Sequence, residues 1–184
     1  MRLTLVIFAM GAAAIGAAFA PALVRAQETP PPGQAALGKR VFQQANCVGC
    51  HKWHGGGGGG YGGDALSLRA TQLDREQIVE TVTCGRPGTG MPYFRRGVYE
   101  GDEHPCYGVG RQELGKDMPV EAGIFLRPAE VAAVTDYVLA DIKGKGEPSY
   151  ADCAAFFGDA ARVCNVYKTV EPASGRAPEE KRGG

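Results

Sequence analysis

Apolar side chains recur at helical spacing in two long segments of the chain. In residues 34–45 the apolar positions are Ala36, Leu37, Val41 and Phe42. In residues 128–142 they are Val131, Val134, Tyr137, Val138 and Ile142. Pro128 suits the first turn of a helix, and Glu130 lies near the positive end of the helix dipole. The pattern therefore predicts one helix that ends just before Cys47 and a second over residues 128–142.

Two shorter helices are predicted from local signals. Asp74 is a suitable N-cap, with Gln77 three residues later in a capping-box arrangement, and Leu73, Ile78 and Val82 share one side. Gly85 and Pro87 end this helix for steric reasons. Residues 150–167 are interpreted as a short helical appendage flanked by Cys153 and Cys164.

The segments without periodicity set the expected domain boundaries. Residues 3–24 are almost all apolar or small and run into Val24-Arg25-Ala26, a small-x-small pattern, which is typical of a cleaved signal peptide over residues 1–26. An uncleaved membrane anchor is the alternative. Residues 27–36 are expected to be a proline-rich linker, 37–145 the main domain, 146–168 the appendage and 169–184 a disordered tail. The glycine run of residues 55–63 and residues 88–125 are expected to be irregular.

The net charge of the chain and its expected cellular compartment exclude one class of function and indicate the state of the cysteines. Twenty basic and twenty acidic residues give a formal charge of zero, which argues against a nucleic-acid binder that relies on net positive charge. Removal of residues 1–26 would leave 18 basic and 20 acidic residues, a net charge of about −2. Export would place all six cysteines in an oxidising compartment, the periplasm, where unoccupied thiols tend to pair.

The motif that carries chemistry is Cys47-Val48-Gly49-Cys50-His51. Two thiols three positions apart can bond both vinyl groups of one haem, and the adjoining histidine is then held beneath the iron. A redox-active dithiol, half of a zinc site and an ordinary disulfide are the alternatives. A thioredoxin-like dithiol should lie in a strand-rich setting and a zinc site should bring a second ligand pair, and neither pattern is present in the sequence. The motif therefore predicts one covalently attached haem c.

Four residues are candidates for the sixth position of the iron: Met91, Met118, His54 and His104. A methionine thioether is the usual ligand in electron-carrying cytochromes c and raises the potential. Both methionines are followed by proline, so local sequence does not separate them. His54 lies too close in the chain to His51 to reach the opposite haem face easily, and we expect both histidines to be ordinary loop residues.

With these features, residues 38–143 resemble the class I monohaem cytochromes c. Gly38 and Phe42 stand where the first helix of that family packs against the last, with Tyr137 as the matching aromatic residue. Residues 78–92 are similar to the bacterial form of the methionine-ligand loop, which favours Met91 and implies an insertion before the last helix. Met118 stays the alternative, because the ligand methionine often precedes the last helix by a short loop. The resemblance implies an all-α cytochrome c fold, with about four helices packed around one covalently bound haem and long irregular loops.

The four other cysteines allow three pairings. The most local choice joins Cys84 to Cys106 and Cys153 to Cys164, each contributing on the order of 3 kcal/mol by constraining the unfolded chain. The first disulfide would clamp the segment that carries Met91, and the second would fasten the appendage. We expect both to be structural.

The sequence departs from the family after the haem motif. Many members have a proline there whose carbonyl accepts a hydrogen bond from the axial histidine, but none occurs between His51 and Pro87. Another carbonyl, within residues 62–66, is expected to replace it. Four further residues could contact haem propionates, but we expect each of them on solvated surface: Trp53, Tyr61, Arg69 and Arg86.

The function predicted from these features is periplasmic one-electron transfer between a dehydrogenase and a terminal acceptor, an oxidase or another cytochrome, with no enzymatic activity of its own. The insertion and appendage resemble those of exported cytochromes that serve a dedicated dehydrogenase, and enzymes that use pyrroloquinoline quinone are one candidate class. No nucleic acid is expected as a partner, and a membrane only if the signal segment is retained. The alternatives are a haem-containing subunit of an oxidoreductase complex and a haem enzyme or sensor with an open sixth site.

Overall fold

The computed structural model describes residues 32–58, 65–101, 103 and 105–168. The expected signal peptide, the tail over 169–184, Tyr61 and His104 lie outside these ranges. The helices are α1 (Pro32–Gln44), α2 (Cys47–His51), α3 (Arg75–Cys84), α4 (Arg111–Leu114), η1 (Gly115–Asp117), α5 (Pro128–Tyr137), η2 (Val138–Ile142), α6 (Tyr150–Phe157) and η3 (Arg162–Tyr167). The described residues form no strand, so the fold is all-α as predicted, with an isolated parallel bridge between Tyr93 and Glu121.

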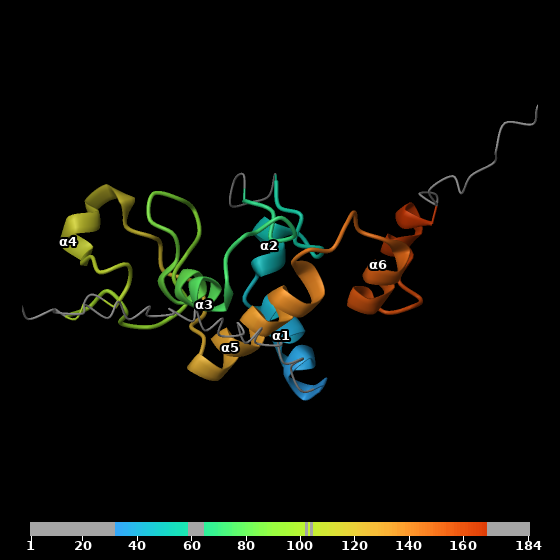
Figure 1. Cartoon of the computed structure of the whole chain (residues 1–184), viewed down its shortest axis with the longest axis horizontal. Coiled ribbons are helices and arrows are strands. Elements are labelled where there is room, and N and C mark those ends of the chain that lie inside the picture. Colours follow the sequence, from blue (N-terminus) through green and yellow to red (C-terminus); the bar gives the residue numbers. More distant parts are fainter. Residues whose placement is uncertain (1–31, 59–64, 102, 104, 169–184) are drawn as a thin grey trace, which may run out of the picture.

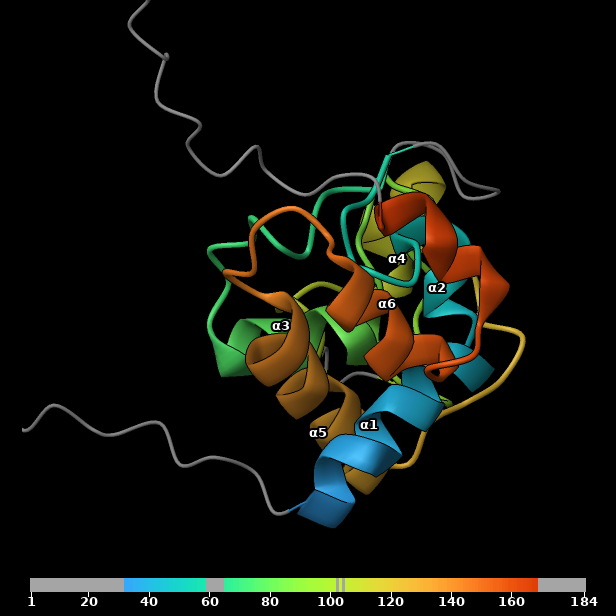
Figure 2. The same ribbon diagram turned by 90° about the vertical axis from the view of Figure 1, so that its right-hand side faces the viewer.

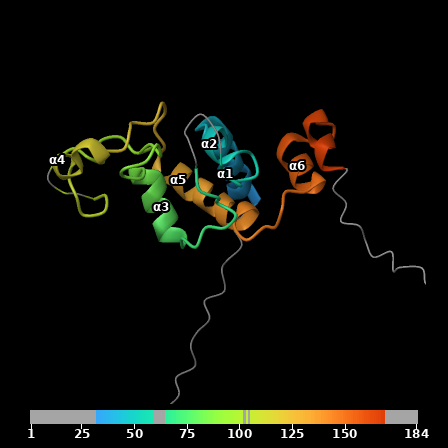
Figure 3. The same cartoon turned by 90° about the horizontal axis from the view of Figure 1, so that it is seen from above.

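Helices α1, α2, α3 and α5 gather in the centre of the molecule (Figure 1). The segment that contains α4 lies at one end and α6 at the other, in the same order when the molecule is seen from above (Figure 3). The view from the α6 end shows α1 and α5 crossing beneath α6 (Figure 2). In the described ranges, no helix combines the length and the apolar character needed to cross a membrane.

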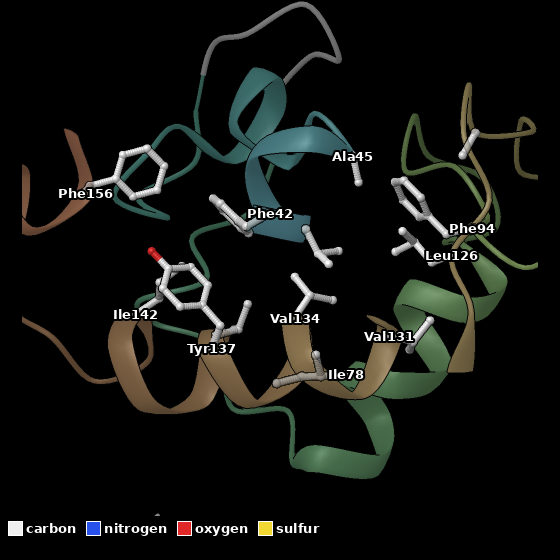
Figure 4. Close-up of a cluster of buried hydrophobic side chains, with 13 residues drawn as sticks. Phe42, Ala45, Ile78, Phe94, Leu126, Val131, Val134, Tyr137, Ile142 and Phe156 are labelled. Atoms are coloured by element: carbon white, nitrogen blue, oxygen red, sulfur yellow. The ribbon is translucent and has the colours of Figure 1, made fainter. Parts of the chain in front are cut away.

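The crossing of α1 and α5 is the centre of the fold, and it depends on Gly38. A Cβ at this position would overlap the carbonyl oxygen of Ala133 and lie 2.6 Å from the Cβ of Tyr137. One turn later the rings of Phe42 and Tyr137 are 5.6 Å apart, tilted by 57°. The predicted contact between these two helices is therefore confirmed, and the two aromatic residues lie in the main hydrophobic cluster (Figure 4).

Asp136 joins three helices. Its carboxylate accepts a hydrogen bond of 2.8 Å from Gln34 on α1 and one of 2.9 Å from Arg75 on α3. The residue itself lies on α5 and is 9% exposed. Helix α3 begins with the predicted capping box, in which Asp74 and Gln77 each accept the other's backbone N–H.

Two helix boundaries differ from the prediction. Helix α1 begins at Pro32, so the second half of the expected linker is helical. Proline is tolerated in the first turn because the backbone N–H groups there have no partner within the helix, so the missing N–H of proline costs no hydrogen bond. Residues 138–142, expected to continue an α-helix, form a π turn in which the N–H of Lys143 donates to the carbonyl of Val138. The wider turn buries both Val138 and Ile142.

The C-terminal helices α6 and η3 are joined by a disulfide between Cys153 and Cys164. Trp53 packs its ring against Phe156, Phe157 and Tyr167 of this unit. Arg69 binds the carbonyls of His54 and Gly146, lies 3.7 Å from the carboxylate of Asp152, and has a side chain only 10% exposed. The expectation of a solvated Arg69 is therefore wrong, and Trp53 is half-buried, because both residues fasten the appendage to the central helices.

A second hydrophobic cluster lies toward α4. Its buried members are Cys84, Tyr93, Val98, Tyr99 and Cys106, with Leu114, Met118 and Phe125 packed against them. The disulfide between Cys84 and Cys106 lies inside this cluster. The structure thus contains both of the local cysteine pairings.

Candidate functional site

One cavity brings together four of the residues selected from the sequence. It has a volume of about 430 Å³, within the range of sites that hold small molecules and cofactors. Its wall includes Cys47, Cys50, His51 and Met91. The rest of the wall comes from the end of α1 and from two distant segments, through Gln44, Ala45, Asn46, Gly90, Pro92, Phe94, Ala122, Gly123 and Ile124.

Cys47 and Cys50 lie one turn apart on α2, and neither is in a disulfide. Residues at this spacing share one face of a helix, so both sulfurs can reach one ligand. Burial raises the pKa of the Cys47 thiol to about 12, with Cys50 adding to the shift. A reactive dithiol needs a lowered thiol pKa, so this environment does not suit disulfide exchange.

His51 is the last residue of α2, and its ring is held by the chain. Its Nδ1 lies 3.2 Å from the carbonyl oxygen of Leu66. Because a carbonyl only accepts, this hydrogen bond requires the proton on Nδ1 and leaves the lone pair of Nε2 for a metal. Burial lowers the pKa of His51, partly offset by the Leu66 carbonyl, which favours the neutral ring that a metal ligand requires. The expected acceptor within residues 62–66 is thereby confirmed.

Met91 reaches the cavity from a loop that follows α3. The backbone N–H of Arg86 donates to the carbonyl of Met91 (3.1 Å), and the N–H of Met91 lies 3.2 Å from the Thr89 hydroxyl. Met118, also in the described part of the chain, packs instead against the second cluster. The structure therefore separates two methionines that are equivalent in their local sequence.

His54 is turned away from this cavity. Its Nδ1 accepts the N–H of Gly56 at 3.1 Å, and its ring contacts Trp53. It lines a smaller cavity next to Arg69 and α6. His54 is thus an ordinary loop residue, as expected, whereas His104 lies outside the described residues.

The wall residues from 122–124 were missed in the sequence, and no motif marks them. They reach the cavity because the Tyr93–Glu121 bridge aligns this segment with the Met91 loop. The N–H of Ala122 donates to the carbonyl of Tyr93 (3.1 Å), and the N–H of Tyr93 donates to that of Val120 (3.0 Å). Such long-range pairing has no local sequence signal.

The donor set fits a covalently bound haem. Two thiols on one helical face, an imidazole with a free Nε2 and a thioether border the same cavity. Residues 33–103 match the family of cytochrome C oxidase, cbb3-type, subunit III. This part of the chain is similar to a c-type cytochrome domain. Comparisons with curated proteins and with solved structures gave no match.

The cytochrome match covers all four donor residues of the cavity and ends before Met118 and α5. A cytochrome c domain implies haem c as cofactor and electron transfer, with redox proteins as partners, as the chemistry of the protein. The fold, the cavity and the family therefore agree on a haem-based electron carrier.

Proposed function

We propose that this cytochrome holds a single haem c through thioethers at Cys47 and Cys50, with His51 as the proximal and Met91 as the distal iron ligand. The observation that carries the proposal is the meeting of these four side chains at one cavity, although Met91 is 40 residues from His51 in sequence. The bound haem supplies the one-electron chemistry. The chain contributes ligand orientation, through the Leu66 carbonyl, and apolar walls such as Phe94 and Ala122 that limit access of water.

The ligand assignment is tested by the near-infrared charge-transfer band that ferric haem shows with a methionine ligand. We expect Met91→Ala to abolish this band and Met118→Ala to retain it. Loss of the band in Met118→Ala alone would refute the assignment. High-spin haem that binds carbon monoxide readily in the unaltered protein would instead favour an enzyme or sensor with an open sixth site.

The cellular role proposed is soluble one-electron transfer in the periplasm, from a dehydrogenase to a terminal oxidase or another cytochrome. The apolar start of the chain and its small-x-small end support export, with residues 1–26 as the signal, 37–145 as the cytochrome domain and 146–168 as the appendage. A dehydrogenase that uses pyrroloquinoline quinone is one candidate donor. The test is to reduce the purified ferric protein with the periplasmic fraction of its host plus dehydrogenase substrates. Absence of the protein from that fraction would contradict the proposal.

A second candidate function is that of a permanent subunit of an oxidoreductase complex. The description of the matched family, an oxidase subunit, favours it. Size-exclusion chromatography of the native protein separates the two roles, because a free carrier elutes as a small protein and a subunit elutes with its enzyme.

A further inference from the structure

Two tyrosines bind the end of α3, where the chain turns into the loop that carries Met91. The hydroxyl of Tyr99 donates to the carbonyl of Cys84 at 2.7 Å, in a buried hydrogen bond. The hydroxyl of Tyr107 donates to the carbonyl of Gly85, also at 2.7 Å. The last carbonyls of a helix lack partners within the helix, and these two phenols supply partners for the carbonyls of residues 84 and 85. They add to the disulfide at Cys84, which holds the same segment.

The loop from Gly85 to Met91 transmits this constraint. Gly85 has a φ of +66°, and a Cβ there would lie 2.8 Å from the carbonyl oxygen of Met91. The N–H of Arg86 donates to that same oxygen, and the hydroxyl of Thr89 donates to the carbonyl of Arg86 at 2.8 Å. The loop is thus closed on residues 85 and 86, and a shift of these residues moves Met91.

The tyrosines are themselves held in place. The disulfide at Cys106 joins the residue before Tyr107 to the end of α3. Tyr107 has a φ of +56°, a conformation that costs energy for a residue with a side chain, and its N–H donates to the Glu80 carboxylate at 3.3 Å. Burial raises the pKa of Tyr99 to about 12 and also raises that of Tyr107, so both hydroxyls keep their protons.

We propose that Tyr99 and Tyr107 are positioning residues for the thioether of Met91, and that their two hydroxyl hydrogen bonds act together as a brace that keeps this sulfur at the iron. The proposal rests on the proposed function, because it takes Met91 as the distal ligand. Without the two phenols, the end of α3 moves more freely and Met91 leaves the iron for a larger fraction of the time.

Imidazole binding to the ferric holoprotein measures that fraction, since imidazole binds only where the sixth position is free. A net hydrogen bond contributes about 1 kcal/mol, so we expect Tyr99→Phe and Tyr107→Phe each to raise the apparent association constant roughly fivefold. The double variant is expected to show a larger increase. Phenylalanine keeps the ring packing, including the contact between Tyr99 and Tyr93 with ring centres 5.4 Å apart.

Tyr150→Phe is the matched control, because its hydroxyl also donates to a backbone carbonyl, that of Asp159 at 3.3 Å, but in the appendage. It should lower stability slightly and leave imidazole affinity unchanged. Equal imidazole affinity in the wild type and both single variants would overturn the brace, even if the variants were less stable. If Met91→Ala keeps the near-infrared band, the ligand assignment fails and the brace with it. If that band is lost but the tyrosine variants bind imidazole as the wild type does, only the brace fails.

Discussion

The ring Nδ1 of His51 and the carbonyl oxygen of Leu66 lie 3.2 Å apart, across 15 residues of chain that contain no proline. In many members of the class I cytochromes that the sequence resembles, a proline carbonyl accepts this hydrogen bond. A hydrogen bond from the ring raises the basicity of the other ring nitrogen and so stabilises ferric iron. This chain therefore tunes the proposed iron ligand through the placement of an ordinary loop residue.

Gly57 controls that placement, and this gives a first prediction. A Cβ on Gly57 would lie 2.8 Å from the carbonyl carbon and 2.9 Å from the oxygen of Leu66. Gly57→Ala should displace the acceptor, weaken the hydrogen bond and raise the reduction potential, as redox titration would measure.

Gly58 supplies the control for this experiment. It has the same φ of +69°, but a Cβ there would meet no atom of the described residues within 4 Å. Gly58→Ala should therefore share the backbone cost of a side chain at positive φ, about 1–2 kcal/mol, without changing the reduction potential. Equal potentials in the two variants would contradict the role of Leu66.

Because α1 and α5 approach closely at Gly38, we expect a side chain at this position to lower the stability of the protein considerably. Gly38→Ala places a methyl group against Ala133 and Tyr137, so the helices must separate, at a cost of about 1–3 kcal/mol in the free energy of unfolding. In the same helix, the new methyl group of Gly33→Ala meets no atom of residues 32–58, 65–101, 103 or 105–168 within 4 Å, and this variant should be neutral or slightly stabilising. Denaturant titration of both variants measures the difference, and equal stabilities would argue against a tight crossing.

The disulfide of the appendage should be separable from the haem site. Replacement of Cys153 and Cys164 by serine releases a cross-link between residues 11 apart, worth on the order of 3 kcal/mol. The single tryptophan of the chain, Trp53, then loses its packing against α6 and η3, and its near-ultraviolet circular dichroism should fall. The near-infrared band of the ferric protein should persist, because the cavity contains no residue of the appendage among those described. Loss of that band would show that the two units are coupled.

Glu130 predicts a dependence of stability on pH. Its hydrogen bonds to the Arg127 side chain and backbone lower its pKa from 4.5 to about 2. A carboxyl whose pKa is lowered by folding stabilises the protein above pH 4.5, and this contribution is lost as the pH falls toward 2. Glu130→Gln should thus be less stable than the wild type at neutral pH, with a difference that shrinks below pH 4.5. Arg127→Gln should show the same trend in acid denaturation, and a constant difference across that range would contradict the pairing.

Features set by neighbouring residues were predictable from the sequence. The capping box of Asp74 and Gln77 needs only four residues, and the Cys47–His51 motif carries its chemistry in its own spacing. The carbonyl that accepts the hydrogen bond from the His51 ring could also be placed within residues 62–66. The chain has no proline after the haem motif, so another carbonyl in the following loop has to take that role.

Long-range packing was not predictable in the same way. Met91 and Met118 have the same following residue, and their separation depends on the second cluster, which the chain assembles from residues 84–125. The sequence favours a solvent-exposed position for Arg69, because its partners at Gly146 and Asp152 lie about eighty residues away in the chain. The hydrogen bonds of the Tyr99 and Tyr107 hydroxyls could not be predicted either. Both hydroxyls donate to backbone carbonyls, and almost every residue offers such an acceptor, so no sequence pattern marks the partner.

The α1–α5 crossing also determines which fragments of the chain can keep a buried hydrophobic core. The cytochrome match stops at residue 103, whereas α5, which covers α1, starts at Pro128 and the core continues to Phe156. A fragment cut at the end of the match would expose Phe42 and leave Gly38 facing solvent. The shortest fragment able to bury this whole core must therefore run from Pro32 to at least Phe156, so the stretch matched by the cytochrome family is shorter than the part of the chain that builds the core.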